Sequence, residues 1–93
     1  MIQALIIHPN DNVAVLTAAA AKGETVEARL DSETVRLTAL DDIPIYHKIA
    51  LRDIQPGELV IKYAHPIAQA ERLIRAGEHV HTHNSHSPEK QGK

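Results

Sequence analysis

Three histidines near the end of the chain alternate with other residues in the run His79-Val80-His81-Thr82-His83-Asn84. Alternate side chains of a β-strand point to one face, so a strand here would put the three imidazoles on the same side. Consecutive imidazoles would be about 6.6–7 Å apart along the backbone, which lets two of them converge on one metal ion. A straight strand would separate His79 from His83 by about 13 Å, so a three-histidine site requires a bend or bulge.

Two other interpretations of this run stay open. The histidines are also compatible with an exposed edge strand that ends in a turn at Asn84. A third interpretation is that they donate hydrogen bonds to a substrate carboxylate, which neutral and charged imidazoles both do.

A second candidate for chemistry is the pair His47-Lys48, which precedes the apolar residues Ile49-Ala50-Leu51. Either side chain is able to act as a general base or to bind a carboxylate. The structural alternative is that alternation along residues 45–51 leaves one of the two simply solvated. Other basic side chains carry less weight: Lys62 is expected at a surface or rim, and His8, His65 and His86 are expected to be structural or solvent-facing.

The elements that must position these residues are short. An alanine-rich stretch, Thr17–Lys22, favours a helix of barely two turns, with Gly23 at the position of a left-handed cap. Segments rich in apolar and β-branched residues, separated by turn residues, predict strands. These are Gln3–Ile7, Asn12–Leu16, a hairpin of Thr25–Leu30 with Thr34–Leu40, and a strand through Val60-Ile61-Lys62.

A weak internal repeat, x-Gly-Glu-x-Val, occurs at residues 22–26, 56–60 and 76–80. Each copy follows a segment able to form one helical turn, and its glycine supplies the turn before a strand. Gly57 and Gly77 are too close in sequence for a βαβ crossover, which argues against a Rossmann-type parallel sheet. Short strands folded back on themselves fit this spacing better.

Composition limits the size and class of the protein. With 93 residues, 43% of them hydrophobic and none of them Phe or Trp, the chain is expected to form one small domain with an Ile, Val, Leu and Ala core. Such a domain has little room for an enclosed active site, so we expect a partner. We assign the domain to residues 1–84 and a flexible polar tail to residues 85–93.

Charge and residue usage exclude several functions. The net charge is −2 and the basic residues are scattered, which argues against a nucleic-acid partner. The chain has no cysteine, and therefore no disulfide or thiolate chemistry. It shows no signal peptide or membrane-spanning run, so we expect a soluble, cytoplasmic protein with no membrane contact. Motifs of serine hydrolases, nucleotide-binding loops, HExxH metalloproteases and EF-hands are absent.

The stretch from His47 to Asn84 resembles the SAF domain of altronate and galactarate dehydratases, and also the stand-alone small subunit of sulfolactate sulfo-lyase. The similarity covers the N-terminal part of the chain only loosely. The matching residues are His47-Lys48-Ile49-Ala50, Asp53-Ile54, Gly57, Val60-Ile61-Lys62-Tyr63, Ile67, Ala70, Ile74, Gly77 and Val80-His81-x-His83-Asn84.

This resemblance implies a mainly β, SAF-like β-clip fold with short helices, and the small subunit of a hydroxy-acid lyase. Such an enzyme eliminates water from a sugar acid such as altronate or galactarate, or sulfite from sulfolactate, to give a 2-oxo acid. A divalent metal, iron or manganese, is expected, held mainly by a large catalytic subunit. The expected roles are catalytic for His47 and Lys48, substrate-binding for His81, His83 and Asn84, and metal-binding for His81 and His83.

Two departures from the family pattern affect the substrate rim. Ala64 and Ala68 stand where the family usually has glycine, and each adds a methyl group where the backbone approaches closely or needs a positive φ. The alternatives are a non-catalytic SAF-type binding or assembly module and, ranked last, a small metal-binding protein acting alone. A homo-oligomer also stays open.

Overall fold

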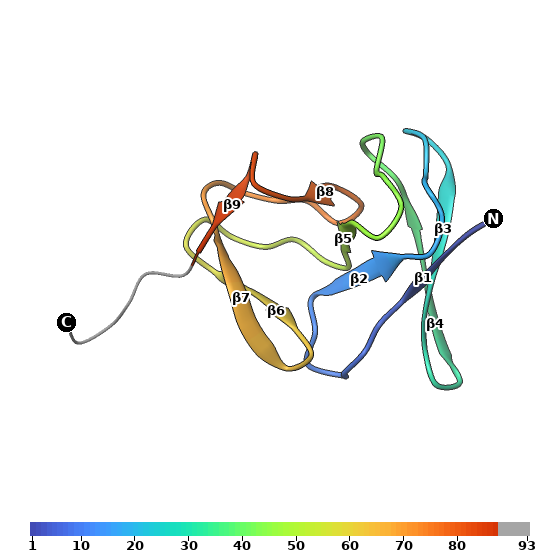
Figure 1. The fold of residues 1–93 in the computed structure, drawn as a ribbon, viewed down its shortest axis with the longest axis horizontal. Helices are drawn as coiled ribbons and strands as arrows, with labels where there is room; N and C mark the ends of the chain where they lie inside the picture. The colour runs from blue at the N-terminus through green and yellow to red at the C-terminus, as the bar shows by residue number, and fades with distance from the viewer. Residues whose placement is uncertain (88–93) are drawn as a thin grey trace.

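The computed structural model describes residues 1–87, which form nine β-strands and no helix (Figure 1). The prediction of a mainly β domain is therefore confirmed, whereas the accompanying short helices are absent from residues 1–87. The strands are β1 (Ile2–Leu5), β2 (Val13–Leu16), β3 (Thr25–Leu30), β4 (Glu33–Thr38), β5 (Lys48–Ala50), β6 (Leu59–Lys62), β7 (His65–Ala70), β8 (His79–Val80) and β9 (Ser85–His86).

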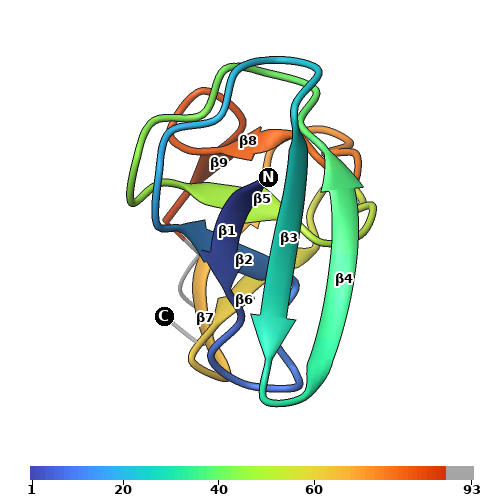
Figure 2. The same cartoon turned by 90° about the vertical axis from the view of Figure 1, so that its right-hand side faces the viewer.

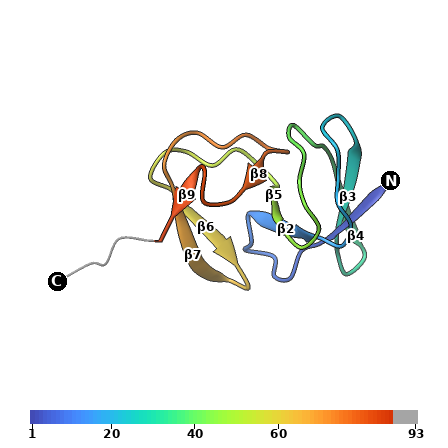
Figure 3. The same ribbon diagram turned by 45° about the horizontal axis from the view of Figure 1, so that its top comes forward.

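Six strands form one sheet in the order β4-β3-β1-β2-β5-β8, and three form a second sheet in the order β6-β7-β9. Within the described chain, β1 and β3 pair in parallel and the other neighbours pair antiparallel. The β3–β4 hairpin lies at one end of the molecule and the β6–β7 hairpin at the other, with β2 and β5 between them (Figure 3). Figure 2 shows the predicted β3–β4 hairpin from its own end, with β1 beside β3.

Two apolar cores lie on either side of the central strands β2 and β5. Ala14 and Ile49 are partners in the ladder and both enter the first core. Val13 and Ala50 are also partners, and both enter the second core. This division follows from the alternation of side chains along each strand. The central strands therefore form a wall that both cores share.

The predicted helix over Thr17–Lys22 is wrong. The segment bends instead, and Ala20 forms an isolated antiparallel bridge with Ile43. The amide of each of these two residues donates to the carbonyl of the other, at 2.9 and 2.8 Å, and both side chains are buried in the first core. Helix propensity is a weak preference, and here long-range pairing and burial override it.

Four segments of the chain share one backbone course of two bends, a bridging residue, a tight turn and a strand. We call them turn 1 (residues 17–25), turn 2 (40–48), turn 3 (51–59) and turn 4 (71–79). The isolated bridges join turn 1 to turn 2 and turn 3 to turn 4. The predicted repeat of glycine turns followed by strands is thus confirmed in turns 1, 3 and 4, but the segments before them are bent rather than helical. Turn 2 is a fourth copy.

A glutamate closes three of these turns. In turn 1 the amide of Ala21 donates to Glu24 Oε1 at 2.7 Å. Glu24 directly follows Gly23, which has a φ of 94°. The same bond joins Gln55 to Glu58 in turn 3 at 2.7 Å and Arg75 to Glu78 in turn 4 at 2.6 Å. Each carboxylate therefore satisfies an amide that the tight turn leaves without a ladder partner.

Turn 2 differs from the other copies at three positions. Pro44 stands where they have the amide donor, Tyr46 replaces the glycine with a φ of 69°, and His47 replaces the glutamate. Proline has no N–H, so turn 2 needs no carboxylate to close it. The side chain at position 47 is therefore released from the turn.

The second sheet continues past Asn84, the last residue of the predicted domain. Ser85–His86 form β9 and pair with Gln69–Ala70 of β7. The rest of the predicted polar tail, from residue 88 onward, lies outside the described residues. No helix that could cross a membrane occurs in the described part of the chain.

Candidate functional site

The histidine run is part strand and part turn. Only His79 and Val80 belong to β8, and the chain then turns through residues 81–84, so the interpretation as one continuous strand is wrong. The buried side chain of Asn84 holds this turn. Its Oδ1 accepts from the His81 amide at 3.1 Å, and its Nδ2 donates to the His79 carbonyl at 2.8 Å. The bend that a three-histidine site requires is therefore present.

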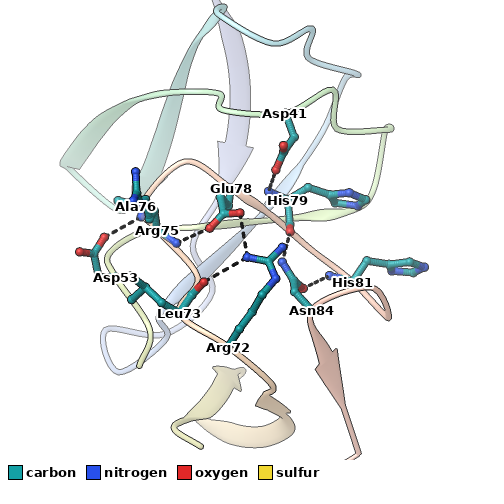
Figure 4. A network of polar contacts seen from close by, with 10 residues as sticks. All are labelled: Asp41, Asp53, Arg72, Leu73, Arg75, Ala76, Glu78, His79, His81 and Asn84. Atoms are coloured by element: carbon teal, nitrogen blue, oxygen red, sulfur yellow. Dashed lines mark hydrogen bonds and ion pairs between the residues drawn. The ribbon is translucent and has the colours of Figure 1, made fainter. Parts of the chain in front are cut away.

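Four imidazoles pack against one another as a result of this bend. The His79 and His81 rings are 5.5 Å apart between centroids and nearly parallel, and they point to the same side in Figure 4. The His47 ring lies 5.0 Å from that of His79 and 4.5 Å from that of His81, and the His83 ring lies 5.1 Å from that of His79. We call His47, His79, His81 and His83 the histidine cluster.

His47 reaches the cluster from turn 2. Side chains 47 and 49 share a face at the start of β5, and Ile49 is the ladder partner of His79. His47 Nδ1 and His79 Nε2 are 2.8 Å apart. In the metal-free chain one of these nitrogens therefore carries a proton that the other accepts.

Lys48 points to the opposite face of β5. It lines an open cavity of about 230 Å³ together with Ile67, His81, Thr82 and Ser85. Neither member of the His47-Lys48 pair is simply solvated, because both side chains are half-buried on their respective faces. His81 belongs both to the histidine cluster and to the Lys48 cavity, and so connects the two faces.

Burial and mutual repulsion keep part of the cluster uncharged. Loss of hydration, followed by the charges of His83, His47 and His81, lowers the pKa of His79 from 6.5 to about 4, and the Asp41 carboxylate acts in the opposite direction. Burial, followed by His47, Lys48 and His83, also lowers the pKa of His81. At neutral pH His79 is therefore neutral and keeps a lone pair for a proton or a metal ion.

The ammonium group of Lys48 is also perturbed. Burial, followed by the nearby charge of Lys62, lowers the pKa of Lys48 from its ordinary 10.5. Lys48 takes part in none of the ion pairs formed within residues 1–87. Its charge is thus available to an anion that enters the cavity.

The structure brings His47, His81 and His83 together and places Asn84 behind them. Asn84 has no exposed surface, and both ends of its amide bond the backbone. The catalytic and substrate-binding roles of these residues stay predictions.

His79 lies at the centre of the cluster. The sequence placed it among three alternating histidines that could bind a metal, but assigned it no separate role. Asp41 was not singled out from the sequence. Asp41 Oδ2 accepts from the His79 amide at 3.0 Å (Figure 4). The two residues are 38 positions apart, so no local pattern links them.

The metal expected from the resemblance fits three members of the cluster. Ring nitrogens of His47, His79 and His81 all lie within 4.8 Å of one another. Ligand atoms around a tetrahedral ion are roughly 3.4 Å apart when each bond is about 2.1 Å long, so small side-chain rotations would suffice. Imidazoles without a carboxylate suit first-row transition ions such as Fe²⁺ or Zn²⁺ better than Mg²⁺ or Mn²⁺. Of the two predicted ligands, His81 belongs to this group and His83 does not.

The amino-acid sequence of this chain matches a known protein family and several known proteins. The family described as the altronate/galactarate dehydratase SAF domain matches residues 2–88. The chain belongs to this family. Altronate dehydratase of Escherichia coli K12 is 47% identical over 83 residues, which are 89% of this chain and 16% of that protein. The enzyme of the same name from Bacillus subtilis 168 is 40% identical over 79 residues, which are 85% and 15% of the two chains.

A shorter relative is the alpha subunit of (2R)-sulfolactate sulfo-lyase from Paracoccus pantotrophus. It is 48% identical over 54 residues, which are 58% of this chain and 81% of that subunit. The SAF domain thus occurs both within a long dehydratase and as a small separate subunit, while the chain spans about a sixth of the dehydratases. The resemblance drawn from His47–Asn84 is confirmed, and the β-clip fold agrees with the observed sheets.

The two alanines that depart from the SAF pattern occupy different environments. Ala64 has a φ of 63°, directly after Tyr63 with a φ of 56°. Asp11 holds this turn by accepting from both amides, at 2.8 Å from Ala64 and 3.1 Å from Tyr63. Ala68 lies in β7 without a positive φ and packs against the second core. The turn therefore forms despite the missing glycine.

Proposed function

We propose that this chain is the SAF component of a hydroxy-acid lyase and that, with a large catalytic subunit, it forms a 2-oxo acid by β-elimination. The observation that supports this most is the junction at His81 between the histidine cluster and the Lys48 cavity. Both features lie in the stretch through which the chain resembles its family. The relatives are named as a dehydratase and a sulfo-lyase subunit.

Elimination from a 2-hydroxy acid requires three chemical roles to be filled by the protein. The C2 proton passes to a base, and the C2–H electron pair stays on C2 as a carbanion. This pair forms the C2–C3 double bond as the C3 substituent leaves with its bonding electrons, either as water after its hydroxyl is protonated or as sulfite. The enol finally takes a proton at C3 and becomes the 2-oxo acid. The site must therefore hold a carboxylate, accept a proton and protonate a leaving group.

We assign carboxylate binding to Lys48. Lys48 is half-buried and has no ion-pair partner within residues 1–87, and Thr82 and Ser85 line the same cavity. A charge-assisted hydrogen bond in a partly dehydrated cavity binds a carboxylate more strongly than one in open water. The substrate is then altronate, galactarate or sulfolactate, which share this carboxylate.

We assign proton transfer to His83, because its ring lies against His79 but outside the group of three close imidazoles. The sequence predicted a catalytic role for His47. Because His47 belongs to the group of three close imidazoles, we assign it to metal binding instead. When bound there, a divalent metal such as iron would act as a Lewis acid on the carboxylate and the hydroxyl. His47, His79 and His81 are the residues that would hold it.

The large subunit completes the site in this proposal. The Lys48 cavity is open, and the chain corresponds to only 16% of the Escherichia coli dehydratase. The remaining groups that surround the substrate would come from the partner. The proposal keeps the expected cytoplasmic location and leaves a homo-oligomer open.

The test is to co-purify the chain with its large partner and measure 2-oxo acid formation from each of the three acids. Lys48→Gln should lower kcat/KM by about 10- to 100-fold, the effect of losing one charged hydrogen bond. Lys62→Gln, a matched change in a neighbouring lysine outside the cavity, should stay within about threefold of wild type. Recovery of an active complex in which Lys48→Gln works as well as wild type would exclude the assignment.

The second candidate is a non-catalytic assembly module. The small share of the dehydratases that the chain spans favours it, because the reacting groups would then all lie elsewhere. It predicts that Lys48→Gln and His83→Gln together leave both complex formation and turnover unchanged. Loss of turnover in a complex that still assembles would exclude the module.

A further inference from the structure

The three close imidazoles come from two separate parts of the chain that the fold fixes against each other. His79 lies in β8, and β8 pairs with β5 directly after His47. The rings of His47 and His79 already touch through nitrogens 2.8 Å apart. Two adjacent unprotonated ring nitrogens repel each other, so this contact requires a shared proton or a shared cation. The ligand spacing is therefore present before any partner joins.

Turn 2 supplies an independent observation. The other three turns use glycine and a glutamate that closes the turn, and turn 2 replaces both. Tyr46 takes up a φ of 69°, a conformation that strains a non-glycine residue, and its side chain is 73% exposed, so packing does not explain it. The evident structural result of these replacements in turn 2 is an imidazole at position 47 that contacts His79.

A set of polar groups fixes the backbone that carries the other two imidazoles. Asn84 bonds the backbone of both His79 and His81, and Asp41 accepts from the amide of His79. These bonds lie entirely within this chain. Binding groups work best when the structure holds them in place beforehand, so a fixed backbone at residues 79 and 81 favours a preformed site.

We propose that this chain by itself binds one divalent first-row transition ion through His47, His79 and His81. The site is complete without the large subunit, contrary to the expectation that the partner mainly holds the metal. Three imidazole ligands leave at least one coordination position open for water or a substrate oxygen. The proposal concerns metal binding alone and does not depend on the lyase reaction.

The test uses the full chain without a polyhistidine tag, stripped of metal with a chelator and titrated with Co²⁺ at pH 7.5. Visible absorption reports the coordination of Co²⁺, and metal analysis after dialysis gives the number of ions bound. We expect one Co²⁺ per chain, displaced by Zn²⁺ as the order of metal affinities requires and not displaced by an equal concentration of Mg²⁺. Absence of Co²⁺ binding by the folded chain would overturn the proposal.

Matched glutamine variants identify the ligands. His47→Gln, His79→Gln and His81→Gln should each weaken Co²⁺ binding by at least roughly tenfold, the least effect expected for losing a group that a metal site needs. His65→Gln, an exposed histidine on β7, should bind as wild type does. His83→Gln should also retain binding, which separates this site from the pair His81 and His83 predicted from the sequence.

His81→Gln decides the matter if His79→Gln unfolds, because the His81 side chain is exposed. Wild-type affinity in a folded His81→Gln variant, or equal losses in His65→Gln, would show that the three imidazoles are not the ligands. The lyase proposal is judged separately. A complex that makes 2-oxo acid while the isolated chain binds no metal would leave that proposal standing and remove this one.

Discussion

The side chain of His81 lies where two features of the molecule meet. One side of its ring contacts His47 in the histidine cluster, and the residue also lines the cavity that contains Lys48. Its placement depends on Asn84, whose amide fixes the backbone at residues 79 and 81. A fully buried residue thus helps to determine where an exposed one points.

Asn84→Ala is therefore expected to lower the free energy of unfolding by about 1–3 kcal/mol, because two buried backbone groups lose their partners. His83→Ala, an exposed change one residue earlier, should alter it by no more than about 0.5 kcal/mol. Urea unfolding of both variants measures the difference. Equal midpoints for Asn84→Ala and wild type would contradict the structural role of this amide.

At the scale of elements, the turns carry most of what is distinctive in the fold. Turns 1, 3 and 4 keep glycine and glutamate, whereas turn 2 and the β6–β7 turn place tyrosine or alanine at positive φ. Left-handed backbone costs a non-glycine residue roughly 1–2 kcal/mol. Backbone strain in these two turns therefore lowers the stability of the folded chain, and turn 2 is the one that positions His47 in the histidine cluster.

Ala64→Gly should stabilise the domain, by up to about 1 kcal/mol, because relief of the left-handed strain exceeds the entropy of the added glycine, about 0.4–1 kcal/mol. Ala68→Gly is the matched control in the same hairpin. It should destabilise by at least about 0.5 kcal/mol, since Ala68 lies in a strand and packs on the second core. Thermal unfolding of the two variants should give shifts of opposite sign.

The outer strands give a pH-dependent prediction. The Gln3 amide donates to Glu27 Oε1 at 3.2 Å and, followed by the charges of Arg36 and Arg29, lowers the pKa of Glu27 below its ordinary 4.5. A carboxyl group whose pKa is lower in the folded state stabilises the fold above pH 4.5 and loses this effect as pH falls through the lowered pKa.

Wild type should therefore be more stable than Glu27→Gln above about pH 5, and the difference should shrink steadily toward pH 3. Urea unfolding of both proteins across this range isolates the contribution of Glu27 from that of the other acids. Two stability curves that run parallel through the acidic range would show that the contacts of Glu27 do not stabilise the fold.

At the scale of the whole molecule, β2 and β5 join two small cores into one unit. Val13 and Ala50 enter one core, while Ala14 and Ile49 on the same strands enter the other. A domain of this size has little stability to spare, so neither core is expected to survive alone.

Val13→Ala should lower the free energy of unfolding by about 2 kcal/mol through the cavity it leaves in the second core. Because the wall is shared, NMR signals of Val26 in the first core and Ile74 in the second should still disappear at one common urea concentration. Persistence of the Val26 signals after those of Ile74 are lost would show that the cores unfold separately.

The sequence alone determined the β class, most of the strands and the residues that dominate the site. Alternating apolar residues and Gly-Glu turns are local signals, and the alternation of His79, His81 and His83 indicates a common face if the run is an extended strand. The family resemblance likewise depends on residues that are visible without coordinates.

Only the tertiary structure decided how these residues meet. Ala20 pairs with Ile43 rather than entering a helix, because the bridge satisfies both backbones and buries both side chains. His47 and His79 are 32 positions apart and come into contact through the pairing of β5 with β8. Turn 2 could not be recognised as a copy, since the replacements that free His47 also remove the glycine and glutamate that mark the repeat. Local propensity sets the pieces, and long-range pairing determines which side chains share a site.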